Sequence, residues 1–161
     1  MRWIERVWYQ QPWYKWPIII LMLPLTWLFW LISRLRRGAF LLGFKTSVKV
    51  SAQVIIVGNI SVGGNGKTPL VVHLAKFLAA NGYHPVLMRQ HVTCPMVVDP
   101  KRARGAQFLI DTHHCDVIIC DDGLQHYALQ RDIEIVVMDG KRRTGNQFLM
   151  PSGPLREPTA R

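Results

Sequence analysis

The stretch VIIVGNISVGGNGKTPLVVHLAKFLAANG, residues 54–82, contains the pattern from which the fold can be predicted. Residues 54–59 are a short run of branched apolar side chains ended by a glycine, which is typical of a buried strand. Residues 70–78 then carry apolar side chains at nearly helical spacing, and Asn81 with Gly82 marks a helix end. A strand, a glycine-rich loop and a helix therefore follow one another in the order of a phosphate-binding βα unit.

The loop between this strand and this helix has the residue types that hold a phosphate. The glycines of residues 63–66 allow the backbone to curl, so that its N–H groups point at an anion near the positive end of the helix. Lys67 supplies a charge for the β and γ phosphates, and Thr68 supplies a hydroxyl for Mg²⁺. Ser61 stands where the usual pattern has a glycine, but the binding depends on backbone N–H groups. A glycine-rich turn with an incidental Gly-Lys-Thr is the alternative interpretation.

Further apolar runs predict the remainder of a sheet. We expect a helix over 101–113 and strands over 84–88, 116–122 and 133–139, with a weaker strand over 94–99. Strands that alternate with helices indicate a mostly parallel sheet with helices on both faces. The predicted fold class is therefore α/β, with a P-loop NTPase-like sheet and flanking helices. Residues 140–161 are rich in Gly, Pro and Arg and show no periodic element.

The strand predicted over 116–122 ends in two carboxylates, Asp121 and Asp122. The carboxyl end of such a strand lies at the same edge of a parallel sheet as the phosphate loop. Carboxylates there can hold Mg²⁺ through its water shell or orient a hydroxyl nucleophile. An acidic pair at a strand end can also belong to an ordinary turn, but the phosphate loop beside it favours a metal site.

Positive charge and apolar residues are concentrated in the N-terminal third. The formal net charge of the 161-residue chain is +10, and Glu5 is the only acidic residue within 1–53. Residues 16–32 carry no charge, a cluster of arginines follows over 34–37, and all six tryptophans lie before residue 31. Apolar residues flanked by tryptophan and arginine are typical of a segment at an anionic membrane surface, and this pattern argues against nucleic acid as the partner.

The apolar run allows several interpretations. A helix that spans the bilayer needs about 20 apolar residues, and Pro24 and Thr26 interrupt this run. A secretory signal would have a small-residue cleavage site after the apolar core, and a buried core helix would not carry so many tryptophans. We therefore favour a helix that lies in or dips into the membrane, followed by a basic connector over 38–53. Three cysteines without metal-site spacing are typical of a reducing compartment.

Four motifs follow one another along the chain: GNISVGGNGKTP (58–69), DDGLQH (121–126), DIEIVVMDG (132–140) and GNQFLMPSGPLREP (145–158). Together with the N-terminal apolar segment they resemble the tetraacyldisaccharide 4'-kinase family, which also has serine or threonine at the position of Ser61. The resemblance implies ATP-dependent phosphorylation of the 4' hydroxyl of a tetraacyldisaccharide 1-phosphate lipid A precursor. It implies ATP and Mg²⁺ as cofactors, and the lipid A disaccharide precursor and the inner-membrane phospholipid surface as partners. The implied location is the cytoplasmic face of the bacterial inner membrane.

The resemblance also implies roles for individual residues. Lys67, Asp121 and Asp122 are expected to be catalytic, and Thr68, Asp121 and Asp122 are expected to bind the metal. Gln125 and His126 match the remainder of the DDGLQH motif, and for His126 a packing role and direct chemistry both stay open. The expected nucleotide-binding residues are Ser61, Val62, Gly63, Gly64, Asn65, Gly66, Lys67 and Thr68.

The sequence departs from the family pattern in one internal region. The family has an SRGYG motif and then a GDEP motif with a catalytic aspartate, whereas this chain runs from PVLM (85–88) directly into RQHVTCPMVVDPKR (89–102). The resemblance covers the N-terminal half of the family. Arg156 with Glu157 matches its GPLRE stretch, for which the residues alone predict no catalytic role and a loop-anchoring salt bridge is the simplest interpretation. We predict that residues 1–49 form a membrane-associated segment and that 50–161 form a truncated P-loop kinase domain.

This domain is expected to bind ATP but to transfer phosphate poorly or not at all, because a missing general base typically costs about 10² to 10⁴ in rate. Two alternatives to the lipid kinase stay open at this point. One is a catalytically inactive nucleotide-binding remnant. The other is a membrane-linked P-loop ATPase that uses ATP as a conformational switch.

Overall fold

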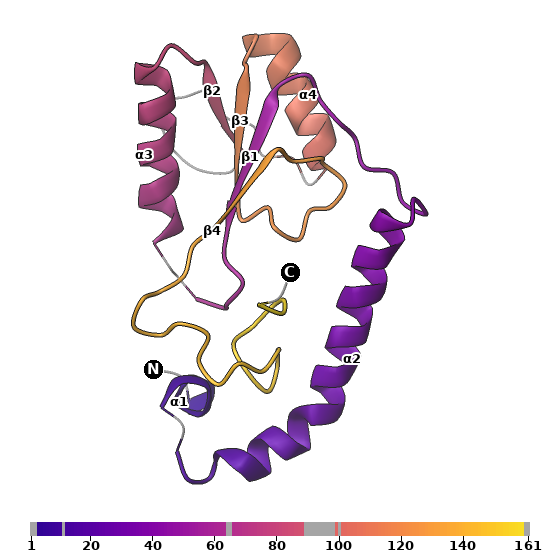
Figure 1. Cartoon of the computed structure of the whole chain (residues 1–161), viewed down its shortest axis with the longest axis vertical. Helices are drawn as coiled ribbons and strands as arrows, with labels where there is room; N and C mark the ends of the chain where they lie inside the picture. Colours follow the sequence, from indigo (N-terminus) through magenta and orange to yellow (C-terminus); the bar gives the residue numbers. More distant parts are fainter. Residues whose placement is uncertain (1–2, 11, 64–65, 89–98, 100, 160–161) are drawn as a thin grey trace.

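The computed structural model describes residues 3–10, 12–63, 66–88, 99 and 101–159. Most of the weak strand predicted over 94–99 lies outside these residues. The elements follow the predicted order of strands and helices (Figure 1), and their bounds are α1 (Trp3–Tyr9), α2 (Lys15–Leu41), β1 (Gln53–Gly58), α3 (Lys67–Ala80), β2 (Pro85–Met88), α4 (Arg102–His113), β3 (Val117–Asp121) and β4 (Ile133–Val136).

The four strands form one parallel sheet in the order β2-β3-β1-β4. The central strands β1 and β3 are buried along almost their whole length because a helix covers each face. Val71 and Ala75 of α3 pack against one face, and Ala106 and Leu109 of α4 pack against the other. This arrangement confirms the predicted α/β fold with a parallel sheet and flanking helices.

Helix α2 is longer than the apolar run suggested. It continues through the arginine cluster to Leu41, so the predicted connector over 38–53 begins four residues too early. Leu, Arg and Ala are good helix formers, and the single Gly38 is tolerated. Pro24 lies inside the helix, which bends in its N-terminal half (Figure 1); a proline removes a backbone hydrogen bond and kinks a helix without ending it.

The described residues of the tail after β4, 137–159, contain no helix or strand but pack into the body of the protein. Residues 152–155 are buried. Thr26 of α2 donates a hydrogen bond to Ser152 Oγ (2.7 Å), and Trp8 of α1 donates its ring N–H to the carbonyl of Pro151 (3.1 Å). The backbone N–H of Val62 bonds to the carbonyl of Pro154 (2.8 Å). The tail therefore joins the N-terminal helices to the glycine loop.

Candidate functional site

The glycine loop lies at the carboxyl end of the sheet, between β1 and α3. Gly66 begins α3 with a φ of 68°, in the left-handed region that glycine adopts without strain. Gly58 ends β1 beside Leu124, and an added Cβ there would lie 2.6 Å from Leu124 Cγ. The backbone conformation therefore requires glycine at position 66, and the close approach of the Leu124 side chain requires it at position 58. Gly64 and Asn65 lie outside the described residues.

Lys67 is held at the mouth of this loop by two oxygen atoms. Its Nζ donates to Asp122 Oδ1 at 2.7 Å and to Asn59 Oδ1 at 3.1 Å. Asn59 in turn donates from Nδ2 to the carbonyl of Gly63 (3.1 Å). Asn59 thus connects the loop backbone to the lysine. Sequence reasoning did not assign it a role, although its position directly after the strand was a usable signal.

Asp122 follows β3 with a φ of 55°, and its backbone N–H bonds to the carbonyl of Val57 (2.8 Å). Aspartate tolerates this left-handed conformation better than most residues. Partial burial acts to raise the pKa of its carboxyl. The hydrogen bond and charge of Lys67, together with Arg156, outweigh that effect, so the pKa lies below its ordinary value of 3.8. The carboxylate is therefore suited to remain ionised.

Asp121 lies beside Asp122 but in a different environment. It is 5% exposed, and its Oδ1 is buried without a hydrogen-bond partner among the described residues. A buried, unpaired carboxylate oxygen is costly, and a bound cation or water would satisfy it. Mg²⁺ usually retains several waters and takes only one or two carboxylates from the protein. The pair Asp121 and Asp122, with the exposed hydroxyl residue Thr68 at the start of α3, fits that donor set.

Arg156 reaches the same site from the tail. Its Nη1 lies 3.4 Å from Asp122 Oδ1. Backbone pairing places it there, because its own N–H bonds to the carbonyl of Ile60 (2.7 Å), and the neighbouring Leu155 forms an antiparallel bridge with Ser61. The expected salt bridge thus exists, but it is made to a predicted catalytic residue. The aperiodic tail gave no pattern from which this contact could be predicted.

The structure brings Lys67, Asp121 and Asp122 together at one edge of the sheet, as expected for the predicted catalytic residues. Gln125 and His126 line two different clefts. Glu157 accepts a hydrogen bond from the hydroxyl of Tyr127 (2.9 Å). In the described part of the chain, no three His, Cys, Asp or Glu side chains are grouped as they would be in a fully protein-bound metal site.

A cleft of about 400 Å³ opens next to the Asp122–Arg156 pair, between α2 and the DDGLQH loop. We call it the central cleft; its lining includes Ser33, Arg36, Gln125, Tyr127 and Arg156. The side-chain nitrogen of Gln125 is buried and has no partner among the described residues. The central cleft therefore offers hydrogen-bonding groups to a polar ligand, and it lies between the charged site and the apolar helix.

Comparison with known proteins gives consistent matches. A family model described as tetraacyldisaccharide-1-P 4'-kinase matches residues 18–86 and 82–161. The tetraacyldisaccharide 4'-kinase of Pseudoalteromonas atlantica is 66% identical over 170 residues, covering 86% of this chain and 56% of that protein. The protein of that name from Tolumonas auensis is 46% identical over 189 residues, covering 98% of this chain and 57% of that protein.

A solved structure has the same fold. It is the crystal structure of the "apo" form LpxK from Aquifex aeolicus in complex with ATP, with a TM-score of 0.74 and 27% sequence identity. The likeness covers 88% of this chain and 55% of that chain.

These matches also show how the chain differs from its relatives. It spans about half the length of the curated relatives it matches. The family match divides into two parts near residues 82–86, and the alignment with the Tolumonas protein extends over 189 positions although this chain has 161 residues. Positions of the relatives therefore have no counterpart here, as the missing SRGYG and GDEP motifs suggested. Because the family model matches most of the chain, the chain belongs to the tetraacyldisaccharide 4'-kinase family.

Proposed function

We propose that this chain binds ATP at its glycine loop and acts in the phosphorylation of the 4' hydroxyl of a tetraacyldisaccharide 1-phosphate lipid A precursor. The observation that carries this proposal is the meeting of Lys67, Asp122 and Arg156 at the mouth of the loop. They come from the start of α3, the end of β3 and the tail. Here two cationic side chains surround one carboxylate. A polyphosphate could bind the two cations in place of the carboxylate, and the carboxylate could then bind a metal ion.

Lys67 and Arg156 are the groups that would contact the nucleotide phosphates. Lys67 lies at the N-terminus of α3, where the helix dipole also favours an anion. Its present partner Asp122 carries one negative charge, and a triphosphate would offer several oxygens in its place. Arg156 can then stabilise charge that develops as the γ-phosphoryl group moves. The relative from Aquifex aeolicus, whose structure is described as a complex with ATP, supports this assignment.

The site also fits Mg²⁺. Thr68, Asp121 and Asp122 would hold the ion, directly or through water, and the unpaired buried oxygen of Asp121 is the observation in favour. When bound, Mg²⁺ neutralises charge on the β and γ phosphates.

The acceptor sugar would occupy the central cleft, where Gln125 and Arg156 can orient its hydroxyl groups. The 4' oxygen then forms a bond to the γ phosphorus, the bond from that phosphorus to the β-phosphate oxygen breaks, and ADP leaves. The hydroxyl proton needs a base, and the lowered pKa of Asp122 makes it a poor one. This reasoning supports slow transfer by a chain that lacks the GDEP aspartate.

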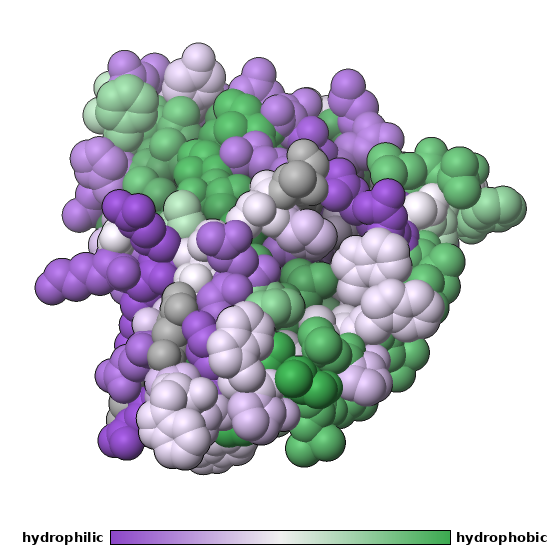
Figure 2. Space-filling model, turned by 60° about the horizontal axis from the view of Figure 1, so that its bottom comes forward, coloured by the Kyte–Doolittle hydropathy of each residue, from purple (hydrophilic) through white to green (hydrophobic). Residues whose placement is uncertain are grey.

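We further propose that residues 1–49 attach the chain to the phospholipid surface of the inner membrane on its cytoplasmic face, and that 50–161 form the kinase domain. Among the described residues, one helix, α2, is long enough and apolar enough to cross a membrane. Figure 2 shows apolar side chains along the right-hand side of the molecule, where α2 lies in Figure 1. Thr26, however, is bonded to Ser152 of the tail. A loop cannot lie in lipid beside the middle of a spanning helix, which favours a helix in the interface.

Transfer of radiolabelled γ-phosphate to the purified disaccharide lipid tests the proposed function. We expect slow, acceptor-dependent labelling that Asp122→Asn abolishes. Asp111→Asn is the matched control, because Asp111 lies exposed on α4 away from the site. ATP hydrolysis that does not depend on the acceptor, or ATP binding without any labelled lipid, would contradict the proposal.

A further inference from the structure

Asn59 is a buried polar residue at the point where β1 leads into the glycine loop. It is 1% exposed. Its Oδ1 accepts a hydrogen bond from Lys67 Nζ (3.1 Å), and its Nδ2 donates one to the carbonyl of Gly63 (3.1 Å). A buried amide is costly unless its polar atoms are bonded. Asn59 meets that cost by bonding to both sides of the glycine loop.

The chemistry of the two partners fixes which way the amide of Asn59 faces. A lysine ammonium can only donate, and a backbone carbonyl can only accept. The oxygen of the amide must therefore face Lys67, and its nitrogen must face Gly63. A carboxylate could make only the first of these bonds, so an uncharged side chain with one acceptor and one donor suits this position.

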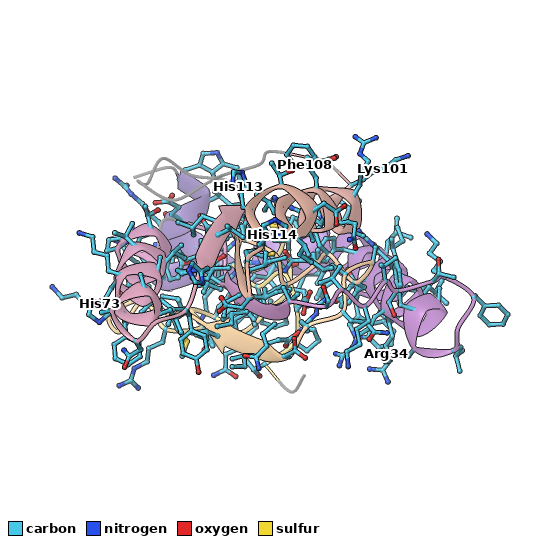
Figure 3. All side chains as sticks on the ribbon, turned by 90° about the horizontal axis from the view of Figure 1, so that it is seen from above. Arg34, His73, Lys101, Phe108, His113 and His114 are labelled. Atoms are coloured by element: carbon cyan, nitrogen blue, oxygen red, sulfur yellow. The ribbon has the colours of Figure 1, made fainter. Side chains whose placement is uncertain are left out.

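The two partners of Lys67 determine the direction of its remaining hydrogen-bond donor. The ammonium group has three N–H donors. One points to Asn59 and one to Asp122 (2.7 Å), and the third has no partner among the described residues. The side chain of Lys67 is only 15% exposed, whereas His73, further along the same helix, lies at the outer side of α3 (Figure 3). The lysine is thus held in a partly enclosed place with one donor open to a ligand.

The two partners of Lys67 differ in charge. Asp122 is a carboxylate with a lowered pKa, so it competes with a polyphosphate for the lysine. The amide of Asn59 carries no net charge and does not repel a polyphosphate. It can therefore stay bonded to Lys67 when phosphate oxygens replace Asp122. A second carboxylate at position 59 would oppose the nucleotide.

The bond to Gly63 acts on the loop backbone. Gly63 has a φ of 131°, in the region that favours glycine, and glycine can adopt several other conformations at little cost. A carbonyl oxygen that turned toward a bound phosphate would repel it, because phosphate loops bind through backbone N–H groups. The amide of Asn59 holds this carbonyl in place.

We propose that Asn59 is a positioning residue for nucleotide binding, which acts through Lys67 and Gly63. This inference rests on the proposed function, because it takes the ligand of the loop to be the polyphosphate of ATP. Asn59 keeps the lysine and the loop backbone in the bound arrangement before ATP arrives. Such preorganisation lowers the cost of ordering these groups on binding.

Calorimetric titration with Mg²⁺-ATP at neutral pH tests the inference. Asn59→Ala should weaken the affinity by about tenfold, since a hydrogen bond to a charged group is lost. Asn59→Asp should weaken it further, because the introduced carboxylate competes with the phosphates for Lys67. Asn81→Ala is the matched control: Asn81 is exposed at the other end of α3 and should be dispensable for binding.

The pH dependence of Asn59→Asp separates positioning from a purely structural role. A protonated carboxyl is uncharged, accepts through one oxygen and donates through the other, so it resembles the amide. Burial at this position favours that form. The affinity deficit relative to the wild type at the same pH should therefore shrink between about pH 8 and about pH 5. The charged groups connected to this position are Lys67 and, beyond it, Asp122 and Arg156, and the wild type contains them all.

Urea unfolding without ATP shows whether each variant is folded. If Asn59→Ala does not fold, the nearly isosteric Asn59→Asp decides the result. Wild-type affinity in Asn59→Ala, or a deficit of Asn59→Asp that is the same at all pH values, would overturn the inference and leave the proposed function intact. A wild type that does not bind Mg²⁺-ATP would overturn the proposed function itself.

Discussion

Arg156 Nη1 lies 3.4 Å from Asp122 Oδ1, although the two residues are 34 positions apart in the chain. The contact follows from backbone pairing of the tail with the glycine loop at Ile60 and Ser61. Any movement of the loop on nucleotide binding would therefore move Arg156 as well. The tail also contacts α2 at Thr26, so one aperiodic segment links α2, the glycine loop and the carboxylate of Asp122.

Replacement of Arg156 should reduce phosphate transfer more than nucleotide affinity. Arg156→Ala removes a donor positioned for charge that develops on the moving phosphoryl group, and the loss of such a donor costs about a hundredfold in rate. Arg156→Lys should restore only part of the rate, since lysine lacks the planar fork. Labelled-phosphate transfer and ATP titration provide the two measurements.

The control for this comparison is Lys141→Ala, which removes an exposed cation from the same tail. Equal rates of phosphate transfer for Arg156→Ala and Lys141→Ala would contradict a role of the Arg156 guanidinium in transfer.

The Lys67–Asp122 pair should make stability depend on pH at the acidic end. The pKa of Asp122 is lowered in the folded chain, so its contribution is fully present above the unfolded value, 3.8. That contribution is lost as the pH falls through the lower folded pKa. Urea unfolding at a series of pH values should show a smaller loss between neutral and acidic pH for Asp122→Asn than for the wild type. Parallel pH curves would contradict the assigned pair.

The two glycines at positions 58 and 38 should respond in opposite ways to alanine. In Gly58→Ala the new Cβ would meet Leu124 Cγ at 2.6 Å, and such overpacking costs about 1–3 kcal/mol. Gly38 lies within α2 with open space around it, so Gly38→Ala should stabilise the helix by up to about 1 kcal/mol. Urea midpoints of the two variants check this. A stabilised Gly58→Ala variant would mean that β1 does not approach Leu124 as described.

Membrane attachment should depend on the exposed face of α2. Leu21 and Leu25 are 79% and 58% exposed there. Their joint replacement by glutamate should lower partition into anionic vesicles by at least about tenfold, because each buried leucine contributes about 1.5–3 kcal/mol. Phe77→Glu is the control, since Phe77 is 57% exposed but lies on α3. If the two variants sediment with vesicles equally, α2 is not the attachment site.

The sequence predicted the sheet and the loop because these depend on local patterns. The run of branched residues over 54–57 and the glycines after it have one common structural outcome, and the two carboxylates follow directly from the apolar strand over 117–120. The site around Lys67 was therefore predictable in its main members. The length of α2 was not, because the arginines after residue 33 ended the apolar run without ending the helix.

Long-range contacts made by single residues could not be predicted from the sequence pattern. Arg156 and Arg102 have no periodic signal. The contact of Arg156 with Asp122 and the burial of Arg102 depend on which segments fold against them. Arg102 in particular looks like an ordinary surface arginine in the sequence. Only its burial at the start of α4, beside Arg36 of a distant helix, distinguishes it.

Calorimetric titration of the chain with Mg²⁺-ATP tests the central claim, that the glycine loop with Lys67 is a nucleotide site. The wild type should bind, and Lys67→Ala should lose most of the affinity, because the charge that meets the β and γ phosphates is gone. Lys76→Ala, which removes an exposed lysine further along the same helix, should bind like the wild type. Equal affinity of the wild type and Lys67→Ala for Mg²⁺-ATP would contradict the assignment of this loop.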